Sequence, residues 1–213
     1  RVERYAIELL PKDAVVDGNL TSVEAVADTL QSCWKRLGTT TRFVAMALPT
    51  AAVITKKITL PASLREQEME IQVESEANQY IPFALEEVNL DFQVIGPAPG
   101  SPDDVEVMLA ASRKEKVEDR VAAAEVAELR PVVMDVEAFA AQAAYELVTK
   151  QLPREGVGQI IALVDVGASA MKVTIMKDDQ QLYVREQAFG GSQLTAEIMR
   201  AYGMGPDEAE NLK

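Results

Sequence analysis

Two periodicities of apolar residues alternate along the chain, one of about 2 residues, typical of strands, and one of about 3.6, typical of helices. Strands are predicted where apolar and polar residues alternate or where short apolar runs end at Pro or Gly: residues 1–10, 42–48, 52–60, 88–95, 105–111, 132–136, 159–165, 171–176 and 181–187. Helices are predicted over residues 21–38, 63–77, 114–129, 139–148 and 192–202, and from Pro206 onward. This alternation of strands and helices predicts an α/β fold with mixed sheets.

Local signals indicate where several of these elements begin and end. Thr21 and Glu24 form a capping box at the start of the first helix, and Gly38 stands where a C-terminal cap belongs. A second capping box begins at Ser63. Residues 96–102 combine glycine with several prolines and are therefore predicted to form a loop.

The composition is that of an ordinary globular protein. The 213 residues suffice for one large or two small domains, with 48% hydrophobic and 26% charged residues. The longest apolar run, over residues 158–167, is far too short to span a bilayer, and the first residues contain no apolar signal core. We therefore expect no direct insertion into a membrane.

Net charge and missing residue types exclude several classes of function. A formal net charge of −13 repels nucleic acid phosphates and anionic lipids, which makes both poor partners. The chain has no histidine and a single cysteine, Cys33, which excludes a disulfide framework, Cys/His zinc sites and catalysis by a His base. Cys33 falls among apolar residues at helical spacing and is interpreted as a core residue.

One segment has the pattern of a phosphate-binding hairpin. Residues 159–165 form a predicted buried strand, and a tight turn of Gly167, Ala168 and Ser169 joins it to the next strand. Because Gly167 has no side chain, backbone amides near it can approach an anion closely. Asp165, at the end of the strand, can hold a hydrated Mg²⁺. The alternative is an ordinary β-hairpin in which the same residues serve only the turn.

Gly190 and Gly191 form a second candidate phosphate site. They lie between the last predicted strand and a helix that begins at Ser192. Backbone amides at a helix N-terminus can meet a phosphate group, and glycine permits a close approach. The alternative interpretation is a sharp turn from strand to helix.

Both candidates lie in segments that resemble one protein family. D-V-G-A-S (residues 165–169) followed by F-G-G-S-Q-L-T (189–195) is similar to the second phosphate loop of the actin, Hsp70 and FtsA superfamily. Further matching segments are ALPTAAVITKKITLP (47–61), EANQYIPFALEEVNLDFQVIGP (76–97), LAASRKE (109–115) and VMDVEAFA (133–140). The resemblance extends over nearly the whole chain, which is identified as a member of the PilM family of actin-like proteins in type IV pilus assembly.

The resemblance implies an actin-like, ribonuclease-H-like α/β fold with an FtsA-type inserted subdomain and an incomplete second half. Residues 1–55 and 130–152 would form subdomain 1A, residues 56–129 the inserted subdomain 1C, and residues 153–213 the start of subdomain 2A. Family members carry a first phosphate loop ahead of the strand expected at residues 1–10, and adenosine-binding glycines further on. The chain is therefore expected to be truncated at both ends and to bind ATP weakly or not at all by itself.

The resemblance also assigns roles to single residues. Nucleotide contacts are expected from Asp165, Gly167, Ala168, Ser169, Gly190 and Gly191. Asp165 and Glu137 are expected on the metal side of an Mg-ATP site, with Asp135 in the same connecting segment as Glu137. An isolated Asp-x-Glu is equally typical of a solvated turn or a helix cap. No residue is expected to be catalytic.

Members of the family bind the short cytoplasmic N-terminal tail of PilN, an inner-membrane pilus protein, in a groove between subdomains 1A and 1C. An extended apolar peptide suits such a groove. Tyr80, Ile81 and Phe83 are candidate wall residues, because this cluster is too apolar for an ordinary loop. The alternative is that Ile81 and Phe83 fill the core under a helix end.

The implied function is a cytoplasmic scaffold, peripheral at the inner membrane through PilN, that meets other inner-membrane pilus assembly proteins. ATP and Mg are implied as ligands of the full-length protein, and a homo-oligomer is left open. The alternatives are a slow actin-like ATPase and a filament-forming protein, although the net charge of −13 opposes close packing of copies. We expect a scaffold because no second catalytic group accompanies Asp165 and Glu137.

Overall fold

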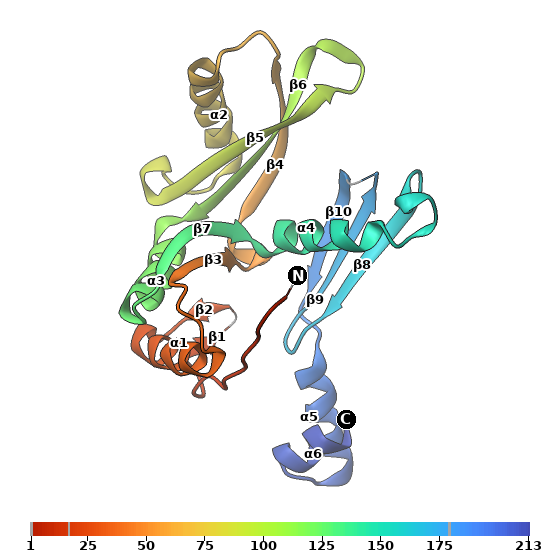
Figure 1. Cartoon of the computed structure of the whole chain (residues 1–213). Coiled ribbons are helices and arrows are strands. Elements are labelled where there is room, and N and C mark those ends of the chain that lie inside the picture. Colours follow the sequence, from red (N-terminus) through yellow and green to blue (C-terminus); the bar gives the residue numbers. More distant parts are fainter. Residues whose placement is uncertain (1, 17, 179) are drawn as a thin grey trace. The chain divides into compact units, whose positions relative to one another are not determined.

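A computed structural model describes residues 2–16, 18–178 and 180–213 (Figure 1). The chain divides into two compact units, Arg1–Glu137 and Ala138–Lys213. Among the described residues, no helix is long and apolar enough to cross a membrane.

The described part of the first unit contains a two-stranded antiparallel pair, a three-stranded sheet, a parallel strand pair, three α-helices and two short 3-10 helices. In chain order its elements are β1 (Val15–Val16), β2 (Asn19–Leu20), α1 (Val23–Leu37), β3 (Phe43–Leu48), η1 (Thr50–Ala52), β4 (Ile54–Pro61), α2 (Glu66–Tyr80), η2 (Leu85–Glu87), β5 (Val88–Ala98), β6 (Ser101–Arg113), α3 (Lys114–Val126) and β7 (Arg130–Val136). Helix α4 (Glu137–Thr149) begins at the boundary of the units.

Strands β4, β6 and β5 form an antiparallel sheet in the order β4-β6-β5, and α2 covers one face of it (Figure 1). Val107 and Leu109 on the central strand are fully buried. Ile58 pairs with Val107 across the ladder, and Met69 and Val73 of α2 pack onto the same cluster. Because alternate residues of β6 point to the same side, Val107 and Leu109 give the sheet one apolar face. Met69 and Val73, one helical turn apart on α2, cover that face.

Strands β3 and β7 form a parallel pair, and helices α1 and α3 pack beside it. The contact is made of small side chains: Ala27, Ala124 and Ala127 are fully buried there. Alanine lets two helix backbones approach closely, which explains why both helices show alanine on their inner faces. Trp34 packs at the edge of this cluster, and its indole N–H donates a hydrogen bond to the Thr41 carbonyl at 2.8 Å.

The caps of the first two helices differ from the sequence prediction by one to two residues. The hydroxyl of Ser22, in place of Thr21, caps α1 by accepting a hydrogen bond from the Ala25 amide at 3.3 Å. The predicted C-terminal cap is confirmed, because Gly38 takes the left-handed conformation with φ of 63°. Helix α2 begins after Arg65, in place of Ser63, and Glu68 accepts from the Arg65 amide at 3.0 Å.

The strand predicted over residues 1–10 is wrong. Residues 2–10 are extended but form no strand, and Val2, Tyr5 and Leu9 are at least four-fifths exposed. An alternating pattern becomes a strand only when a neighbouring strand pairs with it, and none of the described residues does so here. The segment is instead held to the end of α1, where Arg36 forms an ion pair with Glu8 at 2.9 Å.

The loop predicted over residues 96–102 is also wrong in extent. Strand β5 continues to Ala98 and β6 begins at Ser101, so that only Pro99 and Gly100 form the turn. The ladder accommodates Pro97 because its register shifts on both sides of that residue.

The second unit is a three-stranded antiparallel meander followed by two helices. Its elements are α4, η3 (Pro153–Gly156), β8 (Ile160–Val166), β9 (Met171–Lys177), β10 (Gln180–Gln187), α5 (Gly191–Tyr202) and α6 (Pro206–Leu212). The strand order is β10-β9-β8. The prediction that the first of these strands is buried is wrong: Ile160, Val164 and Val166 are more than half exposed, because β8 is an edge strand with one uncovered face.

The subdomain boundaries proposed from the sequence stay a prediction. The division at Glu137 is coarser than that scheme and does not separate the inserted sheet from the rest of the first unit. Helix α3, which the sequence scheme gives to subdomain 1C, packs against α1 and residues of β3.

Candidate functional site

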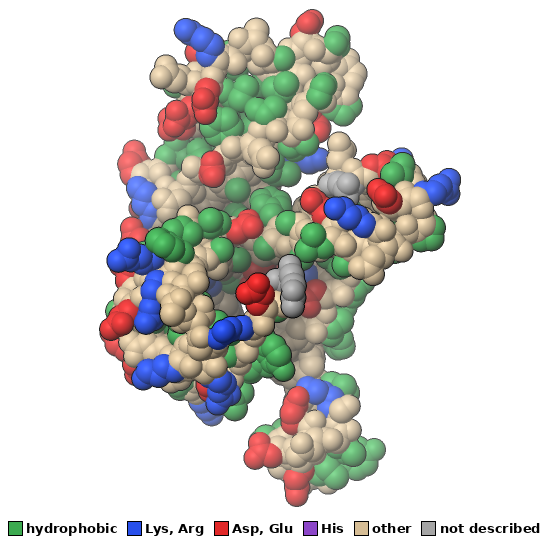
Figure 2. All heavy atoms as spheres, viewed as in Figure 1, with side chains coloured by type: hydrophobic (Ala, Val, Ile, Leu, Met, Phe, Trp, Pro, Cys, Tyr) green, Lys and Arg blue, Asp and Glu red, His purple; other side chains and the backbone are tan. Residues whose placement is uncertain are grey.

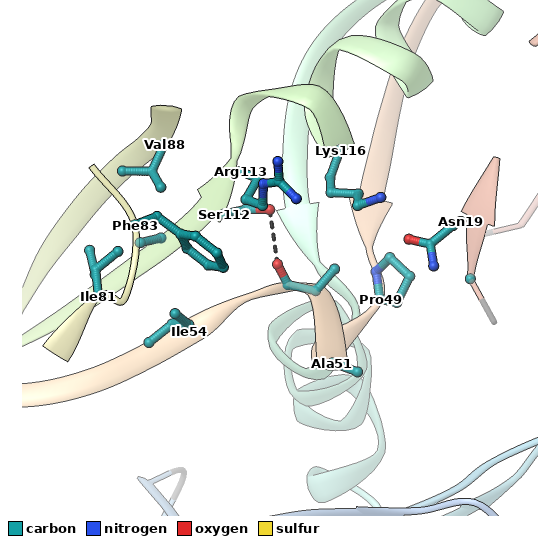
Figure 3. Close-up of a pocket in the computed structure, with 13 residues that line it drawn as sticks. Asn19, Pro49, Ala51, Ile54, Ile81, Phe83, Val88, Ser112, Arg113 and Lys116 are labelled. Atoms are coloured by element: carbon teal, nitrogen blue, oxygen red, sulfur yellow. Dashed lines mark hydrogen bonds between the residues drawn. The ribbon is translucent and has the colours of Figure 1, made fainter. Parts of the chain in front are cut away.

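A groove of about 380 Å³ lies within the first unit, where the ends of β4, β5 and β6 meet the segment after β3 (Figure 3). Its walls come from segments far apart in sequence: Gly18, Asn19, Pro49, Ala51, Ala52, Ile54, Ile81, Phe83, Val88, Ala111, Ser112, Arg113 and Lys116. The volume lies within the range of about 300–1,000 Å³ that is typical of ligand sites in proteins.

One end of the groove is apolar. Ile54, Ile81, Phe83 and Val88 gather there in Figure 3. Ile81 is 6% exposed and belongs to a core cluster with Val88, whereas Phe83 is 40% exposed. Ile81 therefore fills the core under the end of α2 and also lines the groove, whereas Phe83 is partly exposed. That these two residues contact a peptide stays a prediction.

Tyr80, the third residue predicted for the groove wall, does not line this groove. It is the last residue of α2, and the ammonium group of Lys56 lies 4.7 Å from the centre of its ring. This cation–π contact ties the end of α2 to strand β4. We assign Tyr80 to the support of the segment that carries Ile81.

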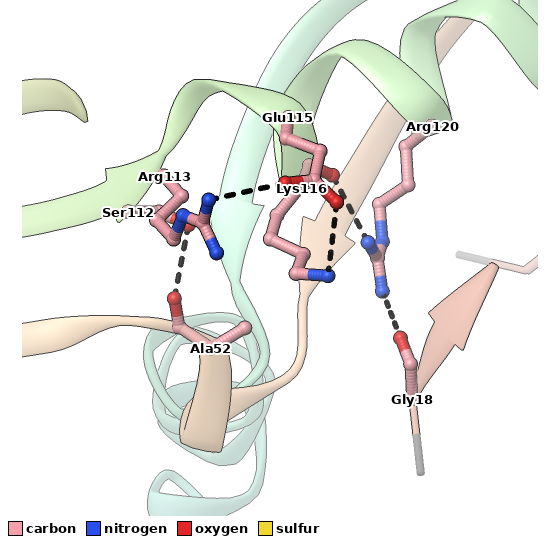
Figure 4. A network of polar contacts seen from close by, with 7 residues as sticks. All are labelled: Gly18, Ala52, Ser112, Arg113, Glu115, Lys116 and Arg120. Carbon is pink, nitrogen blue, oxygen red and sulfur yellow. Dashed lines mark hydrogen bonds and ion pairs between the residues drawn. The ribbon is translucent and has the colours of Figure 1, made fainter. Parts of the chain in front are cut away.

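The other end of the groove is polar and cationic (Figure 4). Ser112 donates a hydrogen bond to the Ala52 carbonyl at 2.9 Å, which joins the end of β6 to the turn before β4. The guanidinium of Arg113 lies 5.4 Å from the centre of the Phe83 ring. Arg113 and Lys116 form ion pairs with the same carboxylate, that of Glu115, at 3.4 Å and 3.7 Å.

A buried arginine holds the far wall of the groove (Figure 4). Arg120, which is 8% exposed, donates to the Gly18 carbonyl at 2.6 Å and to the Lys116 carbonyl at 3.0 Å. Burial lowers the pKa of Arg120 from its ordinary value, and the carboxylates of Glu137 and Asp119 oppose this effect. The two hydrogen bonds attach the turn at Gly18 to helix α3.

Gly18 is also fixed from the opposite side. It has a φ of 74°, and a Cβ atom there would lie 2.9 Å from Cγ of Pro49. Both the conformation and the close approach require glycine at this position. The β1–β2 hairpin, and with it Asn19, is therefore set in a defined place at the groove.

The candidate phosphate hairpin lies in the second unit. Asp165 is an exposed residue near the end of β8, and Ala168 and Ser169 form the exposed tip of the connection to β9. The Gly167 amide donates to the Ala170 carbonyl at 2.9 Å and closes the turn. The two residues at the tip are exposed, so a ligand can reach this turn from solvent.

Gly190 and Gly191 support this hairpin through their own backbone. The Gly191 amide donates to the Gly167 carbonyl at 3.0 Å, and the Ser192 amide donates to the Ala168 carbonyl at 2.8 Å. A Cβ atom on Gly190 would lie 2.5 Å from the Ala168 carbonyl oxygen. The first amides of α5 thus donate hydrogen bonds to carbonyl groups of the hairpin. The glycine pair allows the start of α5 to lie directly against the hairpin.

The acidic residues predicted near a metal are not brought together within one unit. Asp135 lies on β7, where its carboxylate accepts from the Val136 amide at 2.7 Å, and Glu137 begins α4. Asp165 belongs to the second unit. Among the described residues, no group of three or more His, Cys, Asp or Glu side chains is arranged to hold a metal ion. The pairing of Glu137 with Asp165 stays a prediction.

Sequence reasoning missed the polar residues of the groove. Asn19, Ser112, Arg113 and Lys116 come from three elements that only the folded chain brings together. The sole available signal was a charged run at a strand-to-helix junction, at residues 113–116, which by itself is usually a solvated surface.

Two comparisons relate this fold to known proteins. The model of the family described as type IV pilus assembly protein PilM matches residues 1–213. Among solved structures, the chain is similar to one described as the PilM-PilN type IV pilus biogenesis complex, with 31% identity, a TM-score of 0.81 and coverage of 95% of this chain. The chain spans 59% of the length of that protein.

A more distant structural similarity concerns the fold alone. The ethanolamine utilization protein EutJ from Carboxydothermus hydrogenoformans matches with 14% identity and a TM-score of 0.50, over 93% of this chain and 48% of EutJ. Together these similarities confirm the actin-like α/β fold that the sequence predicts.

Proposed function

The chain belongs to the PilM family of type IV pilus assembly proteins, and from this premise we propose that it is a cytoplasmic scaffold that binds the N-terminal tail of PilN. The observation that carries the proposal is the groove of the first unit, with its apolar end at Ile81 and Phe83. The solved complex of a PilM with PilN, at 31% identity to this chain, supports the choice of partner.

The groove suits an extended peptide. Strand β4 pairs only with β6 among the described strands, so its other edge offers backbone donors and acceptors beside the groove. An extended chain gains affinity from such backbone hydrogen bonds and specificity from pockets for alternate side chains. Phe83 supplies an exposed aromatic surface for an apolar anchor of the peptide.

The test is a titration of this chain into a fluorescently labelled peptide with the sequence of the PilN cytoplasmic tail, followed by anisotropy. We expect saturable binding in the micromolar range. Phe83→Ala should weaken binding by about tenfold, which corresponds to about 1.4 kcal/mol, because it removes an aromatic contact from the groove.

A matched control exists in the same unit. Phe43 is 60% exposed on β3 and lies under the guanidinium of Arg130 at 6.0 Å, as Phe83 lies under Arg113, but it does not line the groove. Phe43→Ala should leave the affinity unchanged. Equal losses in both variants, or no binding by the unmodified chain, would contradict the proposal.

We further infer that ATP is a ligand of the full-length protein, with the hairpin after β8 as part of its site. The exposed turn residues Ala168 and Ser169, next to Gly167, which carries no side chain, fit a phosphate group. Asp165 would hold a hydrated Mg²⁺, which neutralises phosphate charge when bound. Glu137 is a second candidate on the metal side.

The function is that of a binding protein whose nucleotide acts on conformation. The sequence motifs of this chain point to Asp165 and Glu137 and to no further group that would position the attacking water of an actin-like ATPase. Attachment to the inner membrane would follow from binding PilN, and contacts with other pilus proteins would use surfaces outside the groove.

A further inference from the structure

We propose that the polar end of the groove is a carboxylate subsite, where Arg113 and Lys116 bind an acidic side chain of the peptide beside its apolar anchor. The inference rests on the proposed peptide function and names a chemical requirement of its ligand.

The charge of the groove is opposite to that of the chain. The whole sequence has 34 Asp and Glu residues against 21 Lys and Arg residues. The described residues that line the groove nevertheless include Arg113 and Lys116 and no carboxylate. Figure 2 shows acidic and basic side chains interspersed over the face that it displays. A local cationic wall favours an anionic partner through complementary potential.

Arg113 is oriented before any ligand arrives. Its guanidinium lies over the Phe83 ring at 5.4 Å, and Phe83 is itself a wall of the groove. A stacked guanidinium keeps its edge free for a planar, two-bonded contact with a carboxylate. The same stacking places the cation next to the apolar surface, so one peptide can contact both.

Glu115, the ion-pair partner of Arg113 and Lys116, leaves part of their hydrogen-bonding capacity unused. Arg113 and Lys116 share the single carboxylate of Glu115, whose side chain is 56% exposed. The contacts of 3.4 Å and 3.7 Å are longer than the roughly 2.7–2.9 Å of a charge-assisted hydrogen bond. Long, exposed ion pairs contribute little to stability, so a peptide carboxylate can join or replace Glu115 at small cost.

The position of the acidic residue in the peptide follows from these contacts. The Arg113 guanidinium lies 5.4 Å from the centre of the Phe83 ring. An extended peptide advances about 3.3 Å per residue, so one or two residues cover this distance. The carboxylate should therefore stand one or two positions from the side chain that packs on Phe83.

The experiment uses tail peptides that differ only by Glu or Gln at each position in turn, titrated into the chain and its Arg113→Gln and Lys116→Gln variants. At the subsite position, the unmodified chain should bind the Glu peptide about five- to tenfold more tightly than the Gln peptide. Each variant should lose most of this preference, measured as the ratio of its affinities for the Glu and Gln peptides. The preference should also shrink as salt is raised.

Two controls match the variants. Arg130→Gln removes a guanidinium stacked on Phe43 outside the groove, and Lys114→Gln removes a charge from the same helical turn as Lys116. Both should keep the Glu preference. If peptides bind but no position shows a preference that depends on Arg113 or Lys116, the carboxylate subsite is wrong and the peptide function stands. If no peptide binds, the proposed function itself fails.

Discussion

Gly190 occupies a place where the backbones of two loops meet without room for a side chain. It is buried between the hairpin after β8 and the first turn of α5. Two hydrogen bonds from the amides of Gly191 and Ser192 cross this contact. The residue has an extended backbone, so lack of space is what requires glycine here.

Gly190→Ala should therefore separate α5 from the hairpin. The added methyl group would lie 2.5 Å from the Ala168 carbonyl oxygen, and backbone atoms must move to relieve this contact. We expect a loss of about 1–3 kcal/mol in the free energy of unfolding. Hydrogen exchange at the amides of Gly191 and Ser192 should become faster. Gly96→Ala is the control, because nothing lies within 4 Å of its added Cβ; equal stability of the two variants would show that the contact is of no consequence.

Arg120 connects secondary-structure elements that are far apart in the sequence. It joins α3 to the β1–β2 turn through the Gly18 carbonyl. Because Gly18 and Asn19 line the groove, this hydrogen bond sets one wall of the groove.

Arg120→Met should leave the Gly18 carbonyl without its donor and loosen the β1–β2 turn. We expect a loss of about 1–3 kcal/mol in the free energy of unfolding, as measured by denaturant titration, and faster hydrogen exchange in the turn than elsewhere in the unit. Arg65→Met is the control, since the Arg65 side chain is 84% exposed and pairs only locally with Glu68. A turn that exchanges at its original rate in Arg120→Met would refute this role.

Most elements could be predicted from the sequence because they carry strong periodic patterns. The helix that packs on the inserted sheet and the central strand β6 both occur where expected. Their ends could not be predicted, because a serine and a threonine at Ser22 and Thr21 are equivalent in sequence and only the folded backbone selects the cap. The strand expected at residues 1–10 failed because pairing depends on a neighbour that no pattern within the segment reveals.

The candidate site could be predicted only where its residues are close in sequence. Ile81 and Phe83 were identified from one unusually apolar cluster, and both line the groove. Arg113 and Lys116 were not identified from the sequence. A charged run at the start of a helix looks the same in sequence whether its side chains face water or a ligand. The distinction arises from the start of β4 and the segment after α2, which the fold brings to the same place.

At the scale of the whole molecule, the proposal that the protein binds ATP can be tested. The chain spans 59% of the length of the PilM protein in the solved complex, so the test uses a protein of full family length that contains these residues. Calorimetry should detect binding of Mg-ATP, and Asp165→Ala should weaken it by about tenfold or more, because a carboxylate is lost from the metal side. Asp207→Ala, an exposed acid on α6, is the control.

Phosphate release on the same proteins separates the scaffold from the slow ATPase. A scaffold should release phosphate slowly in the unmodified protein and in Asp165→Ala alike. Robust turnover that the substitution abolishes would instead establish an enzyme. Mg-ATP binding that is indifferent to Asp165 would remove the hairpin from the nucleotide site.

The position of Trp34 gives the molecule a built-in optical probe. It is the sole tryptophan of the chain. It lies on α1 and packs against the cluster that α1 forms with α3, and its indole N–H donates a hydrogen bond to the Thr41 carbonyl. Its fluorescence therefore reports the surroundings of the first unit and is silent about the second, whereas circular dichroism registers the backbone of both. Two melting curves recorded on one sample, one by each method, would reveal whether the units unfold as a single cooperative block or one after the other.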